Sequence, residues 1–180
     1  MIIDLDTSET WLAAQVGAWR QLRVLRDGLG RGHGEAGRES WDRHITGAIA
    51  ELAVAKMLGV FWSGKAQDFG RNGDVEQFEI RSTIHERGCL IVYPEDPDSR
   101  VMLLVIVRRQ SYRIAGSIVA SHAKRPEFAP PQAKLRPGSP PQFWVPQNRL
   151  TPFAPSIVGR RRDVDSSAEI PRRANAVDVS

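Results

Sequence analysis

The spacing of apolar residues changes near residue 77, and this change limits the folds that the chain can adopt. Before it, residues 6–29 and Ser40–Leu58 carry apolar side chains at helical spacing. After it come four short segments typical of strands: Gln77–Ile84, Cys89–Tyr93, Val101–Arg108 and Tyr112–Ala120. Helices followed by closely spaced strands predict an α/β protein with a small central β-sheet, and the short connections favour an antiparallel meander.

The first helical segment is amphipathic. Asp6 followed by Glu9 is typical of a capping box at its start. A stripe of large apolar residues follows at helical spacing: Leu12, Val16, Trp19, Leu22 and Leu25. We expect this stripe to face the core.

The remaining segments are connections. Residues 28–38 contain Gly32, Gly34 and Gly37 in a formal dinucleotide-binding spacing, but a helix rather than a strand precedes them, so we interpret them as a connector. A short strand is expected at residues 60–63. Nine prolines between residues 126 and 155 predict irregular chain with one strand at Phe143–Val145. We therefore expect one domain over residues 1–158, with its core at about 40–154, and a disordered charged tail at 159–180.

Composition excludes several classes of protein. The net charge of +4 permits contact with an acidic polymer without requiring it. The single cysteine, Cys89, precludes an internal disulfide, and four histidines without paired spacing argue against structural zinc. The start of the chain lacks a signal-peptide pattern, so a cytoplasmic location is expected.

Glu51 is the only charged residue in the small, apolar segment Gly47–Ala55. Close packing around such a helix places this carboxylate in a buried position. A buried carboxylate requires a cation, hydrogen-bond donors or a proton. On this observation alone, a structural ion pair and a functional role remain equal alternatives.

The strand over residues 78–85 has two different faces. Phe78, Ile80 and Ile84 fall on one face, which suits a core, whereas Glu79 and Arg81 fall on the other, with Thr83 and His85 beyond them. Hydrolysis of phosphodiesters with a divalent metal requires carboxylate ligands from separate elements and benefits from a neighbouring cation. Glu51, Glu79 and Arg81, with Asp68 or Asp74 from the glycine-containing segment before the strand, supply these groups.

Several sequence segments carry a family resemblance. They are GAIAELAVAKMLGVFW, DFGRNGD, FEIRSTIHERGCLIVYPEDPDSRVMLLVIV, YRIAGSIVASHAKR and FWVPQNRLTPF, which together span about residues 45–154. In this order they resemble small, mostly phage-encoded proteins of unknown function in the PD-(D/E)XK nuclease superfamily. The resemblance implies a restriction-endonuclease-like core, in which a helix with an acidic residue precedes a small mixed central β-sheet flanked by helices.

The resemblance also implies roles for individual residues. Glu51, Asp68 and Glu79 would hold Mg²⁺ or Mn²⁺, as one ion or two, and Asp74 is the alternative to Asp68. Arg81 stands where the superfamily usually has lysine. Because arginine stays protonated, it can stabilise the charge of a transition state but cannot act as a base.

Further residues are auxiliary candidates. Thr83 and His85 lie on the polar strand face, where they can contact phosphate, and Lys124 and Arg125 follow the fourth strand as candidate phosphate contacts. The leading hypothesis is a Mg²⁺-dependent nuclease-like protein acting on DNA, in the host cytoplasm if phage-encoded. The alternatives are a catalytically inactive binding module of the same fold, and a phage structural or host-interaction protein. The oligomeric state is left open, with a dimer as one option.

Overall fold

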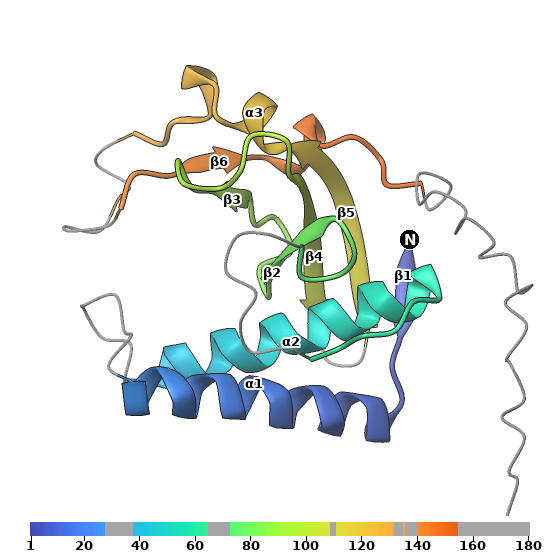
Figure 1. Ribbon diagram of the computed structural model, residues 1–180. Coiled ribbons are helices and arrows are strands. Elements are labelled where there is room, and N and C mark those ends of the chain that lie inside the picture. Colours follow the sequence, from blue (N-terminus) through green and yellow to red (C-terminus); the bar gives the residue numbers. More distant parts are fainter. Residues whose placement is uncertain (28–37, 65–72, 109–110, 132–134, 136–139, 155–180) are drawn as a thin grey trace, which may run out of the picture.

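The computed structural model describes residues 1–27, 38–64, 73–108, 111–131, 135 and 140–154. Two helices of equal length, α1 (Thr7–Asp27) and α2 (Arg38–Leu58), lie side by side beneath a β-sheet (Figure 1). A capping box begins α1, as expected, because Asp6 and Glu9 exchange backbone-to-carboxylate hydrogen bonds of 2.7 and 2.8 Å. At the end of α2, Gly59 adopts a positive φ of 65°, a conformation that favours glycine and ends the helix.

The central sheet has four strands in the order β1-β5-β4-β2. They are β1 (Ile2–Asp4), β2 (Phe78–Thr83), β4 (Val101–Arg108) and β5 (Ser111–Val119). A separate two-stranded ribbon joins β3 (Leu90–Val92) to β6 (Phe143–Val145). The short helix α3 (Ala120–Ala123) and two single 3₁₀ turns, Pro126–Phe128 and Gln147–Arg149, complete the described elements. The chain is thus a mixed α/β protein with a mixed central sheet.

The predicted antiparallel meander is wrong. β2 pairs with β4 in parallel, whereas β4 pairs with β5, and β5 with β1, in antiparallel fashion. The parallel pairing arises because β3 leaves the plane of the sheet and pairs with β6, so the chain crosses over before β4 begins. As a result β2 is an edge strand, and on its outer edge the N–H groups of Phe78 and Ile80 bond to Val75 and Asp74.

The sheet separates two hydrophobic clusters. Leu103 and Val105 of β4 face α2, where they pack with residues such as Ala53 and Val54. The alternate β4 residues Met102, Leu104 and Ile106 pack beneath α3 and the β3–β6 ribbon. β4 is therefore covered on both faces, as its continuous apolar sequence predicts.

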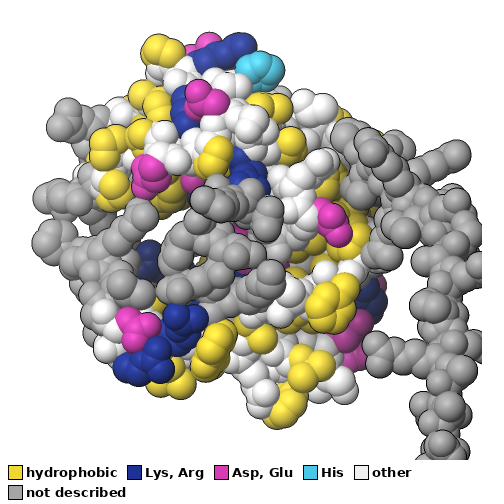
Figure 2. Space-filling model, viewed as in Figure 1, with side chains coloured by type: hydrophobic (Ala, Val, Ile, Leu, Met, Phe, Trp, Pro, Cys, Tyr) yellow, Lys and Arg dark blue, Asp and Glu magenta, His cyan; other side chains and the backbone are white. Residues whose placement is uncertain are grey.

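The predicted core stripe of α1 is wrong, because the helix is turned so that its large residues face water. The residues buried on α1 are Ala13, Gly17 and Gln21. A Cβ atom at Gly17 would lie 2.5 Å from the Cα of Ile45, so α1 and α2 approach too closely for a larger side chain. Trp19, Leu22 and the rest of the stripe remain exposed or half-buried, and hydrophobic side chains gather along the lower edge of the molecule over α1 (Figure 2).

Three smaller expectations also differ from the structure. Ser40, at the start of the second helical segment, is a residue type expected to cap a helix. It lies instead within α2 and donates a buried hydrogen bond of 2.6 Å to Gln21. Residues 60–63 form no strand. Ile84 follows the end of β2 and is 68% exposed, so it takes no part in the core.

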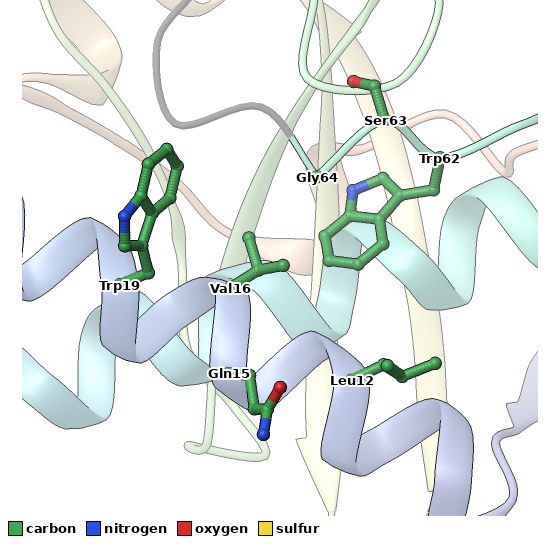
Figure 3. A pocket seen from close by; sticks show the side chains of 7 residues that line it. All are labelled: Leu12, Gln15, Val16, Trp19, Trp62, Ser63 and Gly64. Atoms are coloured by element: carbon green, nitrogen blue, oxygen red, sulfur yellow. The ribbon is translucent and has the colours of Figure 1, made fainter.

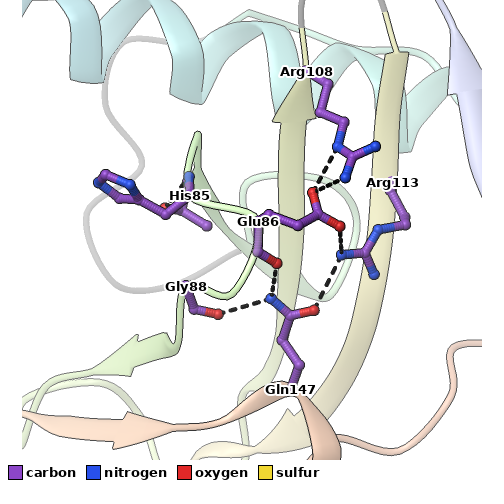
Figure 4. Close-up of polar contacts among 7 residues, drawn as sticks. His85, Glu86, Gly88, Arg108, Arg113 and Gln147 are labelled. Carbon is purple, nitrogen blue, oxygen red and sulfur yellow. Dashed lines mark hydrogen bonds and ion pairs between the residues drawn. The ribbon is translucent and has the colours of Figure 1, made fainter.

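A polar network holds the connection between β2 and β3 against the sheet (Figure 4). Glu86 accepts hydrogen bonds from Arg108 and Arg113, which lie on β4 and β5. Gln147 donates to the carbonyl oxygens of Glu86 and Gly88, at 2.8 and 3.0 Å. These contacts tie the connection, which includes His85, to three other elements.

The close contact between α1 and α2 can be tested at two helical glycines. We expect Gly17→Ala to lower the free energy of unfolding by about 1–3 kcal/mol, because the added methyl group meets backbone atoms that cannot move away. Gly47→Ala is the matched control. Its Cβ would meet nothing within 4 Å, so helix propensity should raise stability by up to about 1 kcal/mol. Urea unfolding of both variants measures the difference, and equal effects would contradict the packing.

Candidate functional site

Glu51 meets the cation that its burial requires. It lies on α2 with 6% of its surface exposed, and Arg20 of α1 donates to both of its oxygens, with N···O distances of 2.5 and 2.8 Å. Trp62 Nε1 donates a third hydrogen bond, 3.1 Å long, to Oε2. Because Arg20 and Trp62 lie on different segments, this one carboxylate joins α1, α2 and the chain that leaves α2.

Asp74 is brought to the outer edge of β2 by a tight reversal of the chain. Val75 and Phe78 exchange backbone hydrogen bonds, and the Gly73 N–H donates to the carbonyl of Glu76. A Cβ at Gly73 would lie 2.4 Å from the oxygen of Phe78, so only glycine fits at this point. The reversal lets Asp74 Oδ2 accept a 2.8 Å hydrogen bond from the Ile80 N–H.

The surroundings of Asp74 disfavour its charged form. Burial, followed by repulsion from Glu51 and Glu79, raises the pKa of Asp74 to about 7, against the opposing effect of the Ile80 hydrogen bond and Arg81. Three carboxylates therefore lie near enough to influence one another. Within the described part of the chain, Asp74 makes no ion pair.

Glu79 and Arg81 share the polar face of β2, as predicted from the alternation of side chains. Arg81 lies 3.3 Å from Glu79 and 2.9 Å from Asp96, and its guanidinium stands 5.6 Å from the ring centroid of Tyr93. The other oxygen of Asp96 accepts a hydrogen bond of 2.9 Å from the Tyr93 N–H. Arg81 therefore contacts the turn after β3, through Asp96, as well as Glu79 on its own strand.

Burial and neighbouring charges shift the pKa of Glu79 in opposite directions. Burial raises the pKa of Glu79, Arg81 lowers it and Asp96 raises it again, and the net shift is upward. Both Asp74 and Glu79 therefore carry raised pKa values at the same edge of the sheet. Such carboxylates are common at functional sites, although structural ion-pair networks produce them as well.

A cleft of about 620 Å³ opens beside this cluster, between the first half of α2 and the strands β2 and β3. Arg81 and Tyr93 line it together with Thr83 and His85. From α2 it receives Arg43, which is exposed. Two arginines, a histidine and several hydroxyl groups thus face a common space, together with Asp42 and apolar side chains such as Ile91. The arginines, the histidine and the hydroxyl groups can donate hydrogen bonds to an anionic ligand.

The remaining candidates occupy different places. Asp68 lies outside the described residues. Lys124 contacts the turn that bears Asp96. It donates hydrogen bonds to the carbonyls of Pro94 and Asp96 and forms an ion pair of 2.7 Å with Asp98. Arg125 is exposed. Among the described residues, no three His, Cys, Asp or Glu side chains lie close enough to hold a metal ion, so these residues do not by themselves fit the expected Mg²⁺ or Mn²⁺.

Three residues of the cluster were not anticipated as functional. Asp96 lies between Pro94 and Pro97, a composition typical of a turn, and Trp62 belongs to no motif. A signal was present for Arg20 alone. The isolated carboxylate of Glu51 requires a cation, and the preceding helix supplies candidates.

Comparison of the chain with known family models, with curated proteins and with solved structures finds no match. The resemblance noted in the sequence therefore remains an expectation. None of the helices in the described ranges is long and apolar enough to cross a membrane.

The Arg20–Glu51 pair predicts strong coupling between two substitutions. Arg20→Met should lower the free energy of unfolding by about 3–5 kcal/mol, because it leaves a buried carboxylate without its cation. Adding Glu51→Gln, which keeps an oxygen for Trp62, should recover much of the loss. Urea unfolding of the wild type, both single variants and the double variant gives the coupling energy. Additive losses would contradict the pairing.

The raised pKa of Asp74 predicts a pH-dependent stability. The folded-state pKa of about 7 exceeds the ordinary value of 3.8, so the folded protein loses stability as the pH rises through this window. Asp74→Asn mimics the neutral form. Its free energy of unfolding relative to wild type should therefore increase from pH 4 to pH 8, by on the order of 2–4 kcal/mol. A difference that does not change with pH would contradict the burial of this carboxylate.

Proposed function

We propose that this protein binds the phosphate backbone of DNA in the cleft between α2 and β2–β3, as a catalytically inactive module with a restriction-endonuclease-like core. The observation that carries the proposal is the position of Arg81. It lines the cleft and at the same time pairs with Glu79 and Asp96, whereas Arg20 holds Glu51. Arginines thus form ion pairs with Glu51 and Glu79, two carboxylates that a nuclease would use to bind metal ions.

The proposed fold rests on the order of the elements. A helix with an acidic residue, α2, precedes a mixed sheet whose edge strand carries Glu79 and Arg81. Asp74 fits the motif aspartate better than its sequence position suggested, because its carboxylate hydrogen-bonds to the backbone of the same strand. The excursion of β3 into a separate ribbon is a departure from a simple nuclease core.

The cleft supports an anionic ligand through its donors. Arg43 presents a full positive charge at an exposed position, and Thr46, Ser82 and Thr83 bring hydroxyl groups. Groups of these kinds contact phosphate oxygens without reading the bases. We therefore expect binding that depends strongly on salt and weakly on sequence.

A second candidate is metal-dependent hydrolysis of DNA, and Asp74 is the observation that favours it. Its carboxylate is buried near Glu51 and Glu79 and has a raised pKa, a condition that a bound cation would relieve. This candidate requires ligands beyond the described side chains. No catalytic step is assigned to it.

Fluorescence anisotropy with a labelled DNA duplex tests the binding proposal. Arg43→Gln should weaken binding several-fold and reduce the slope of log affinity against log salt by about one. Arg149→Gln is the matched control, because it removes the same charge at a 57% exposed position paired with Glu127. Equal losses in both variants, or no binding by wild type at low salt, would rule out the cleft as the DNA site.

The same preparations separate binding from cleavage. Incubation of plasmid DNA with wild type and with Glu79→Gln, in Mg²⁺ or Mn²⁺, should give identical traces if the module is inactive. Nicking by wild type that disappears in both Glu79→Gln and Asp74→Asn would replace the proposal with the second candidate.

A further inference from the structure

The outward face of α1 carries more apolar surface than a solvated helix requires. Small residues face α2, so the large ones face away from the molecule. Five side chains on this face are between 43% and 59% exposed: Trp11, Leu12, Trp19, Leu22 and Leu25. Together they leave on the order of 500 Å² of apolar surface in water, a size that marks interaction sites on soluble proteins.

The spacing along this face is that of a helix seam. Leu12, Gln15, Trp19, Leu22 and Arg26 follow one another at intervals of three and four residues. Intervals that alternate between three and four residues place all of these side chains on one narrow stripe of the helix. Such a stripe is suited to a second helix lying alongside.

A hollow of about 520 Å³ lies at the middle of this stripe (Figure 3). Its helical lining is Leu12, Gln15, Val16 and Trp19, which stand at positions i, i+3, i+4 and i+7. Four residues at these positions form the hole that receives a side chain from a facing helix. Trp62 and Gly64 add a further wall to it, which gives room for a large side chain.

We propose that α1 pairs with α1 of a second copy of this chain, antiparallel and about a two-fold axis near Gly17. In this register the residue numbers of facing positions add to 34. Leu12 then faces Leu22 of the second copy, and Trp19 faces Gln15, at the mouth of the hollow. Each copy inserts Trp19 into the hollow of the other, as an isologous interface requires.

The dipole of α1 favours this antiparallel arrangement over a parallel one. The charges at its ends are already paired within the chain, Glu9 with Lys56 and Arg26 with Asp27. Antiparallel pairing places the positive end of each helix dipole beside the negative end of the other. A parallel pair would place like ends of the two dipoles together.

The exposed area also matches a dimer. A stable interface buries about 800 Å² on each partner and is about 56–65% apolar. The apolar surface of this face, with Gln15 and the arginines as a polar rim, supplies that proportion. The lining of the hollow shares no residue with the lining of the proposed DNA cleft, so the interface leaves that cleft uncovered.

Sedimentation velocity across a range of protein concentrations tests the proposal. Wild type should sediment as a dimer, with twice the 20.1 kDa mass of the chain. Trp19→Asp should raise the dimer dissociation constant by at least about 100-fold, because the residue occurs twice at the centre of the interface. The matched control is Ile84→Asp, which changes another exposed apolar residue, 68% exposed, away from α1 and should leave the dimer intact. Circular dichroism at the same temperature establishes that both variants are folded.

Disulfide formation tests the direction of the helices. In a Cys89→Ser background, one preparation carries Leu12→Cys and the other Leu22→Cys. Antiparallel pairing predicts that oxidation of an equimolar mixture gives mainly the mixed dimer, whereas either preparation alone crosslinks poorly. Crosslinking of each preparation with itself, a wild type that is monomeric at all concentrations, or a dimer unaffected by Trp19→Asp would overturn the proposal.

Discussion

The buried ion pair between Arg20 and Glu51 holds together the parts of the molecule that form the candidate site. The helices α1 and α2 meet through small residues, with Gly17 against the backbone of Ile45, and such a contact buries little apolar area. The ion pair, together with the buried hydrogen bond from Ser40 to Gln21, joins the two helices at defined positions along their lengths. A buried pair of this kind adds modest net stability, but the loss of either member is costly, so it restricts the alternatives open to the chain.

Arginines also pair with other carboxylates of the candidate site. Glu51 is neutralised by Arg20, and Arg81 is shared between Glu79 and Asp96. Within the described residues Asp74 is left with a backbone donor only, and burial beside two other carboxylates raises its pKa. This distribution underlies both proposals for the site: the paired arginines favour binding without catalysis, and Asp74 is the feature that keeps hydrolysis as the second candidate.

Much of the local structure could be predicted because it depends on neighbouring residues. The bounds of β4 and β6 agree with the predicted strands, and α2 ends at Leu58 where Gly59 follows. β1 was missed because three residues are too few to establish an alternation. The meander failed because loop length says nothing about a strand such as β3, which leaves the sheet to pair with a segment about fifty residues further along the chain.

The sequence alone determined that Glu51 needs a partner and that Glu79 and Arg81 lie on one face of a strand. Both conclusions follow from burial and from the two-residue period of a strand, which are local properties. Only the tertiary structure decided that the partner of Glu51 is Arg20, that Arg81 also binds Asp96, and that the large residues of α1 face outward. These outcomes depend on how closely two helices can approach, and that distance is set by residues such as Gly17 and Ile45 that lie far apart in the chain.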